Sequence, residues 1–334
     1  MTIKDLARKT GYGVATVSRV LNGHPSVSEA ARITILRAAE ESGFQLNSNA
    51  KQLKQQRSNA ILVVVKGRSN ELFSELIESI QALADRVHYP LHVDYMEESL
   101  NEVQRAVQLC REVKPLGVLF LGGDSQNIID DFHQIDLPCV LVTNDSSDLN
   151  FDNLSSVCID NRQAARAAMD AMVAQGHRSF AIVGGFKETS TTSRLRYEGC
   201  IDSLKSHGIG FDEALSYRGV LFSYENGYKA TKELIEQGQN FTALFAAADV
   251  MAIGAIRALT DCGLKVPEDV SVMGFDGLPF GSYFVPQLST IAQSIDEMAK
   301  LSMEMLISQI KDGAAARHVF VPFTLLQRES TRCI

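Results

Sequence analysis

The segment Val14-Ala15-Thr16-Val17-Ser18-Arg19-Val20-Leu21-Asn22 decides how this chain begins to fold. At helical spacing, Val17, Val20 and Leu21 fall on one apolar side. The remaining positions carry hydroxyl, guanidinium and amide groups that can contact phosphates and base edges. Such a helix suits the major groove of DNA, although the same pattern also suits a small helical domain with a solvated polar face.

The flanking residues predict one helix before this segment and one after it. The turn Gly11-Tyr12-Gly13 separates the segment from an earlier helical run, and Gly23-His24-Pro25 ends it. Ser28 is a candidate N-cap for a third helix that ends at Gly43. Three short helices with a three-residue turn predict a helix-turn-helix.

Charge is distributed unevenly along the 334 residues, whose formal net charge is −8. Residues 1–60 hold nine Lys and Arg against four Asp and Glu, whereas the remainder holds 23 against 36. A basic head on an acidic body indicates that only the head meets a polyanion. The six cysteines are scattered, without a Cys-x-x-Cys pair, and we expect reduced thiols in a cytoplasmic protein with no membrane span.

Residues 46–58 are polar and hold one isolated large apolar side chain, Leu53. We expect a linker that becomes helical only against a partner. From Ile61 onward, apolar runs alternate with amphipathic stretches. The expected strands are 61–65, 117–121, 139–142, 180–183, 243–246 and 270–273. The expected helices are 72–87, 102–113, 162–175, 193–207, 225–236, 250–263 and 296–310. This alternation predicts an α/β fold with two doubly wound parallel-sheet subdomains and a cleft between them.

Several motifs resemble the LacI/GalR family of bacterial transcription regulators. They are Thr2-Ile3-Lys4-Asp5-Leu6-Ala7, residues 15–23, Val27-Ser28, residues 175–178, Arg196-x-x-Gly199, residues 249–254, 266–272, 274–276, 286–291 and 328–331. The resemblance covers nearly the whole chain. It implies a helix-turn-helix domain (1–45), a hinge (46–58) and a periplasmic-binding-protein-like body (59–334). The body would comprise subdomain 1 (about 59–160 and 294–320) and subdomain 2 (about 161–293 and 321–334).

The resemblance also implies roles in DNA binding. Val14, Ala15 and Arg19 would read bases, and Leu53 would wedge into the minor groove, unless it is an ordinary linker residue. Phosphate and further DNA contacts would come from Thr2, Thr16, Ser18, Asn22, Ser28 and Asn47. Because one head contacts only a half-site, we expect a homodimer on a palindromic operator in double-stranded DNA.

In the body, the resemblance implies an effector site between the subdomains. Arg196 and Asp276 would grip vicinal hydroxyls, while Phe222 and Phe73 would flank the ring. Asp249 is a further candidate. From the residues alone, Arg196 could be a surface ion-pair residue, Phe222 could be core, and Asp276 could form a turn. We expect a carbohydrate effector first and a purine-like or other corepressor second, with no cofactor and no metal.

The chain departs from the family pattern at several positions. Tyr12-Gly13 replaces the usual Val-Ser, so the recognition helix lacks its hydroxyl cap, and Leu46 replaces a proline before the hinge. Ala248 stands where an asparagine is common, which removes an amide from the cleft. Thr143-Asn144 replaces a frequent Asp-Arg pair.

Two other classes of protein fit the sequence less well than a ligand-controlled repressor does. A transporter's solute-binding protein would account for the body but not for the basic head. An enzyme is disfavoured because the sequence has no Gly-x-Gly-x-x-Gly after a strand, no phosphate loop, no nucleophile elbow and no metal-ligand spacing. We therefore predict a sequence-specific transcriptional regulator, a repressor controlled by a small molecule.

Overall fold

The computed structural model describes residues 3–21, 27–42, 58–67 and 70–334. The chain divides into two compact units, Met1–Arg57 and Ser58–Ile334, here called the head and the body. Of the predicted DNA-contacting residues, Thr2, Asn22, Asn47 and Leu53 lie outside the described residues, as does the hinge up to residue 57.

The head contains three helices around a small apolar core. They are α1 (Ile3–Thr10), α2 (Val14–Leu21) and α3 (Glu29–Glu41). Leu6 of α1, Val17 of α2 and Ile35 of α3 are fully buried against one another. Helix α2 begins directly after Gly13, whose carbonyl accepts from the amide of Val17 at 3.1 Å. The predicted helix-turn-helix is therefore present.

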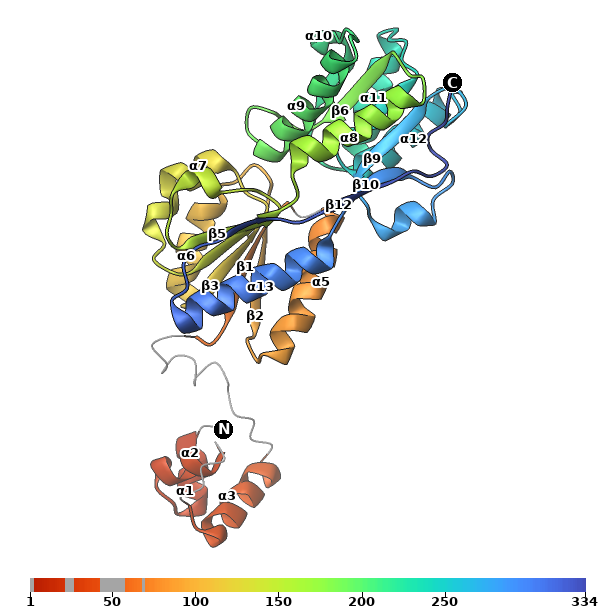
Figure 1. Ribbon diagram of the computed structural model, residues 1–334. Helices are drawn as coiled ribbons and strands as arrows, with labels where there is room; N and C mark the ends of the chain where they lie inside the picture. The colour runs from red at the N-terminus through yellow and green to blue at the C-terminus, as the bar shows by residue number, and fades with distance from the viewer. Residues whose placement is uncertain (1–2, 22–26, 43–57, 68–69) are drawn as a thin grey trace. The chain divides into compact units, whose positions relative to one another are not determined.

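The first sheet of the body is parallel, with strand order β11-β5-β4-β3-β1-β2. Its strands are β1 (Ile61–Lys66), β2 (Leu91–Met96), β3 (Gly117–Leu121), β4 (Cys139–Val142), β5 (Leu154–Cys158) and β11 (His318–Phe320). One face carries α5 (Glu71–Arg86) and α13 (Ile295–Asp312), which lie side by side in Figure 1. The opposite face carries α6 (Glu102–Val113) and α7 (Ser125–Asp131).

The second sheet has the order β12-β10-β9-β8-β6-β7, and only β12 is antiparallel to its neighbour. Its strands are β6 (Phe180–Gly184), β7 (Tyr217–Gly219), β8 (Ala243–Ala246), β9 (Ser271–Asp276), β10 (Ser289–Gln293) and β12 (Phe323–Leu326). The covering helices pack as two pairs, α8 (Asn161–Ala174) with α9 (Thr191–Ser206) and α11 (Tyr224–Glu236) with α12 (Asp249–Asp261). A short helix, α10 (Glu213–Ser216), precedes β7.

The chain crosses between the two sheets at three places: between β5 and α8, between β10 and α13, and between β11 and β12. The crossings are tied together, since Val321 donates to the carbonyl of Cys158 at 2.8 Å and Ser294 donates to that of Pro322 at 2.6 Å. The two sheets, joined only by these three short crossings, form two lobes. Such crossings are where lobes of this kind bend relative to one another.

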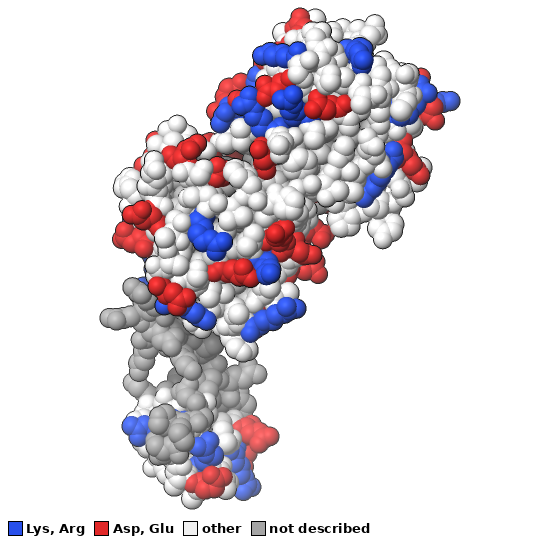
Figure 2. Space-filling model, viewed as in Figure 1, with Lys and Arg blue, Asp and Glu red and all other residues white. Residues whose placement is uncertain are grey.

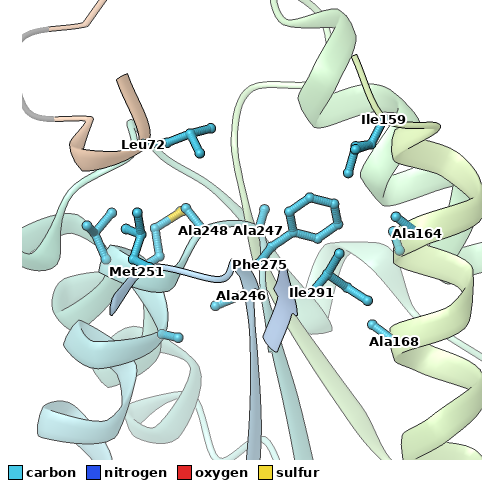
Figure 3. Close-up of a cluster of buried hydrophobic side chains, with 14 of the residues drawn as sticks. Leu72, Ile159, Ala164, Ala168, Ala246, Ala247, Ala248, Met251, Phe275 and Ile291 are labelled. Carbon is cyan, nitrogen blue, oxygen red and sulfur yellow. The ribbon is translucent and has the colours of Figure 1, made fainter. Parts of the chain in front are cut away.

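The core of the second lobe extends to the edge where its parallel strands end. Figure 3 shows Phe275 pointing between Ile291 and the helix that carries Ala164 and Ala168, with Ala247 and Ala248 on the adjoining turn. All of these side chains are buried. A rigid apolar layer therefore supports the residues that follow β8 and β9.

The two-sheet α/β architecture that we predicted is confirmed, and the long helices agree with prediction within a few residues. The strands that were not predicted are β2, β5, β7, β10, β11 and β12. None of the helices in the described part of the chain is long and apolar enough to cross a membrane.

Candidate DNA-binding and effector-binding sites

The surface of α2 presents the side chains that a DNA-reading helix needs. Val14, Ala15 and Arg19 are exposed, while Thr16 and Ser18 are half-buried. Val17 and Val20 point into the head core, which fixes the opposite face outward. A guanidinium can donate two hydrogen bonds to a guanine edge, and small apolar side chains can meet thymine methyl groups.

Ser28 occupies the N-cap position of α3, as predicted, but its hydroxyl makes no capping hydrogen bond. The hydroxyl is exposed. It is thus available to an external acceptor such as a phosphate oxygen. Figure 2 shows basic and acidic side chains mixed on the visible face of both units, with no single-sign field across the body.

A cavity of about 660 Å³ lies between the two lobes, at the carboxyl ends of the parallel strands of both sheets. This is where open α/β sheets bind ligands. The wall from the first lobe includes Lys66, Asn70, Leu72, Phe73, Glu97, Glu98, Ser99, Asn101, Asp124, Asn127, Thr143 and Asn144. The wall from the second lobe includes Phe186, Thr189, Ser190, Thr192, Arg196, Leu221, Phe222, Ser223, Asn226, Ala248 and Asp276.

Arg196 and Asp276 form a buried charge pair in this wall, with 3.5 Å between Nη1 and Oδ1. The guanidinium donates from Nε to Asn161 at 2.9 Å and from Nη1 to the carbonyl of Ala247 at 2.5 Å. It also stacks on the ring of Phe275 at 3.7 Å. Arg196 is therefore held in one geometry by neighbours on several sides, which preorganises it for a ligand.

The electrostatics of the pair follow from its burial. Burial lowers the pKa of Arg196 to about 10, although Asp276 opposes this change. Burial raises the pKa of Asp276 to about 6, while Arg196 and the amide of Gln293, which donates at 2.8 Å, act in the opposite direction. Above pH 6 the cavity therefore offers a fixed donor beside an ionised acceptor, the combination that grips adjacent hydroxyls.

Asp249 does not line the cavity, so the direct ligand contact that we predicted for it is wrong. Its side chain is fully buried behind the wall, where it accepts from Thr290 Oγ1 at 2.6 Å and from the amide of Leu278 at 2.7 Å. Burial and the nearby charge of Asp276 raise its pKa to about 8. Asp249 thus anchors the turn after β9 that carries Asp276.

The two predicted aromatic residues lie in opposite walls of the cavity. Phe73, at the start of α5, is 5% exposed, and Phe222, ahead of α11, is half-buried. Phe186, which was not predicted as a site residue, lines the same cavity and is 46% exposed. It follows the glycine pair 184–185 in a loop without helical or strand spacing, and no pattern distinguished it.

Sequence reasoning also missed a charged cluster in the first lobe. Lys66, at the end of β1, forms an ion pair with the buried Glu102 at 2.6 Å, and Asn127 donates to the same carboxylate at 2.9 Å. Burial raises the pKa of Glu98, whereas the Lys66 ammonium and the amide of Phe222, which donates to Glu98, lower it. Glu98 therefore extends from one lobe to the backbone of the other.

Other hydrogen bonds also join the lobes around the cavity. Thr192 donates to Asn144 at 2.7 Å, and Tyr224 donates to Glu71 at 2.5 Å. Asn144, one of the residues that depart from the family pattern, is thus a bridge between the lobes. Ala248 lies in the wall at the N-cap of α12 and makes no side-chain cap.

Comparison with known proteins identifies two matching families. Residues 2–47 match bacterial regulatory proteins of the lacI family, and residues 169–331 match a periplasmic binding protein-like domain. The transcriptional regulator MalR of Clostridium butyricum is 34% identical, with 99% of each chain covered. The transcriptional repressor CytR of Escherichia coli K12 is 32% identical, with 100% of this chain and 97% of that protein covered.

Solved structures show the same similarity. A lac repressor dimer bound to operator and the anti-inducer ONPF has a TM-score of 0.80 at 27% identity, with 99% of each chain covered. A complex of the regulator CelR with cellobiose has a TM-score of 0.71 at 26% identity, again with 99% of each chain covered.

Proposed function

The chain belongs to the lacI family of bacterial regulatory proteins, and on that premise we propose that a neutral saccharide in the cavity controls repression. The protein is a DNA-binding transcriptional regulator rather than an enzyme. The single observation that best supports a saccharide effector is the buried pair Arg196–Asp276, which faces the cavity with aromatic rings nearby. Pyranose rings carry adjacent hydroxyls that match such a pair and apolar faces that suit Phe222.

The charges of the wall favour a neutral ligand over an anionic one. Lys66 is already paired with Glu102, and Arg196 with Asp276. The lining side chains include two basic residues, Lys66 and Arg196, and four acidic ones, Glu97, Glu98, Asp124 and Asp276. Acidic groups therefore outnumber the basic groups that could attract a sugar acid or a sugar phosphate. The volume of about 660 Å³ falls in the range that buries drug-sized ligands and exceeds the need of a single ring.

DNA binding is proposed to use the exposed face of α2, with Val14, Ala15 and Arg19 at the bases and Thr16, Ser18 and Ser28 at phosphates. A homodimer would place two heads on a palindrome. Thr2, Asn22, Asn47 and Leu53 stay in the proposal as further DNA contacts. The saccharide can act only through different affinities for two arrangements of the lobes, which the crossings near residues 158, 294 and 322 permit.

A thermal-shift screen of the full chain tests the effector. The panel comprises cellobiose, maltose, glucose, ribose, glucuronate, glucose 6-phosphate and adenosine. A neutral saccharide at 100 times its Kd should stabilise the protein by about 2.7 kcal/mol. Asp276→Asn should abolish the shift, whereas Asp152→Asn, an exposed carboxylate outside the cavity, should preserve it. A shift only with adenosine would support the purine-like class, and a shift only with the anions would contradict the charge argument.

A further inference from the structure

The loop from Gly185 to Ser190 joins β6 to α9 and supplies part of the cavity wall. Phe186, Thr189 and Ser190 all line the cavity from this loop. Within it, the amide of Ser190 donates to the carbonyl of Phe186 at 3.0 Å, and the Ser190 hydroxyl caps α9. Lys187 lies in the middle of the loop but is not a lining residue. A residue that fixes this loop can therefore affect the shape of the cavity without contacting a bound ligand.

Lys187 points away from the cavity into a cage of aromatic and acidic groups. Its ammonium is 2.5 Å from Glu213 Oε1, 4.1 Å from the centre of the Tyr197 ring and 5.2 Å from that of Tyr217. The side chain is only 18% exposed, which is low for a lysine on a loop. Contact with two rings and a carboxylate restricts the movement of the ammonium, and this restrains the backbone that carries it.

The cage is itself braced by its members. The Tyr197 and Tyr217 rings meet edge to face with centroids 4.9 Å apart, and the Tyr197 hydroxyl donates to Glu213. The hydrogen bonds from Lys187 and Tyr197 lower the pKa of Glu213 below its ordinary value, which favours the ionised carboxylate that pairs with Lys187. The groups belong to the loop, to α9, to α10 and to β7, so the cage joins four elements.

The same cage holds the start of the loop. The Tyr217 hydroxyl donates to the carbonyl of Gly185. A Cβ at Gly184 would lie 2.8 Å from the Tyr217 hydroxyl, and a Cβ at Gly185 would lie only 2.1 Å from Ser193 Oγ and 3.2 Å from the Phe222 ring. The glycine pair thus lets the backbone lie close to both the cage and the cavity wall.

We propose that Lys187 is a positioning residue, whose seat among Tyr197, Tyr217 and Glu213 fixes the loop that presents Phe186, Thr189 and Ser190 to the cavity. Its influence on an effector rests on the proposed function of the cavity. The anchoring itself does not, because it can be measured with no ligand present.

The chain contains no tryptophan, so Phe186→Trp introduces a single fluorescent reporter into the loop. In full-length F186W, adding Lys187→Met should shift the emission to the red and raise the acrylamide quenching constant. Lys187→Arg should restore both values, since a guanidinium also binds rings and carboxylates. The matched control is Lys229→Met, which removes a lysine equally 2.5 Å from a carboxylate but 62% exposed and on α11.

Unchanged emission and quenching in F186W/K187M would overturn the proposal, as would an equal response to K229M or a failure of K187R to restore the signal. Circular dichroism establishes that each variant is folded. If K187M does not fold, Glu213→Gln decides the matter, because it removes the charge at a half-exposed side chain. A red shift with E213Q supports the anchoring, and no shift overturns it. Failure of the saccharide screen with a positive fluorescence result would refute the proposed effector alone.

Discussion

Asp276 has a φ of 121°, a backbone conformation that L-residues rarely adopt. Such strain persists only where the surroundings impose it, and it is common at ligand sites. Here the carboxylate of Asp249 fixes the following turn through Leu278, and Gln293 and Arg196 hold the Asp276 side chain. The strained residue therefore presents its carboxylate to the cavity in one orientation.

The buried carboxyl group of Asp249 predicts a pH dependence of stability. The pKa of Asp249 is about 8 in the folded protein against an ordinary 3.8. A raised folded-state pKa gives stability that is complete below about pH 4 and is lost as pH rises through about 8. Asp249→Asn cannot ionise, so between pH 6 and 8 it should gain about 2 kcal/mol relative to the parent. Urea unfolding at both pH values measures this difference, and parallel stabilities would contradict the shifted pKa.

Arg19 is the residue on which the DNA-reading role of α2 can be tested. Arg19→Ala should weaken binding to a selected operator by about 1–3 kcal/mol, with a much smaller loss on random DNA. Fluorescence anisotropy on both duplexes gives the two values. Arg37→Ala serves as the control, because it removes the same charge from α3, where Arg37 forms an ion pair with Glu41 of the same helix. Equal losses on both duplexes would mean that Arg19 contacts only phosphate.

At this scale the sequence predicted three side chains of the second-lobe wall. Arg196 and Asp276 belong to family motifs, and Phe222 matches an aromatic position of the family. The sequence could not show which of Asp249 and Asp276 contacts the ligand, because both lie at the carboxyl end of a buried strand. Only the packing decides which of the two carboxylates faces the cavity. Lys66, Glu98 and Phe186 follow strands without any motif, and their approach to the site depends on how the lobes meet.

At the scale of helices and strands, several helix N-termini meet the cavity, and one lacks a capping side chain. Asn70, Asn101, Asp124, Ser190 and Ser223 each accept from their own helix, whereas Ala248 at α12 cannot. The Ala248 backbone already has the extended conformation of an N-cap. Because alanine has no amide or hydroxyl, the free backbone N–H groups at the start of α12 receive no hydrogen bond from the N-cap side chain.

Ala248→Ser should therefore stabilise the protein by about 0.5–2 kcal/mol through a new cap. The cavity gives the hydroxyl room, because Ala248 lies in its wall. Ser223→Ala, which deletes an existing cap at α11, should destabilise it by a similar amount. Thermal unfolding of the pair measures both effects, and a loss of stability in A248S would show that the position rejects a polar side chain.

The position of a strand in its sheet decided whether the sequence predicted it. Runs such as β1, β3 and β8 are continuously apolar because both faces are covered, and this pattern identified them. Strand β2 is an edge strand with His92 and Asp94, and β5 and β10 bury serines or threonine. Their hydrogen bonds, supplied by tertiary neighbours such as His318 and Asp249, are not visible in local sequence.

At the scale of the whole molecule, control of DNA binding requires that the body exist in two arrangements. The three crossings between the lobes are the points about which the lobes would bend. Hydrogen bonds such as Tyr224–Glu71 and Thr192–Asn144 join the lobes around the cavity. A saccharide that bridges the lobes would add to these contacts in one arrangement. The free energy by which it favours that arrangement limits the change in DNA affinity.

The central claim is therefore tested most directly by measuring operator affinity with and without the saccharide that binds most tightly in the thermal-shift screen. Full-length protein is titrated onto a palindromic duplex selected from random sequences, at fixed salt, with a scrambled duplex as the control. We predict that the saccharide changes the Kd for the palindrome by about tenfold or more, in the range typical of allosteric coupling, and leaves the scrambled duplex unaffected. An identical Kd for the palindrome in both conditions, with the saccharide demonstrably bound, would contradict the account.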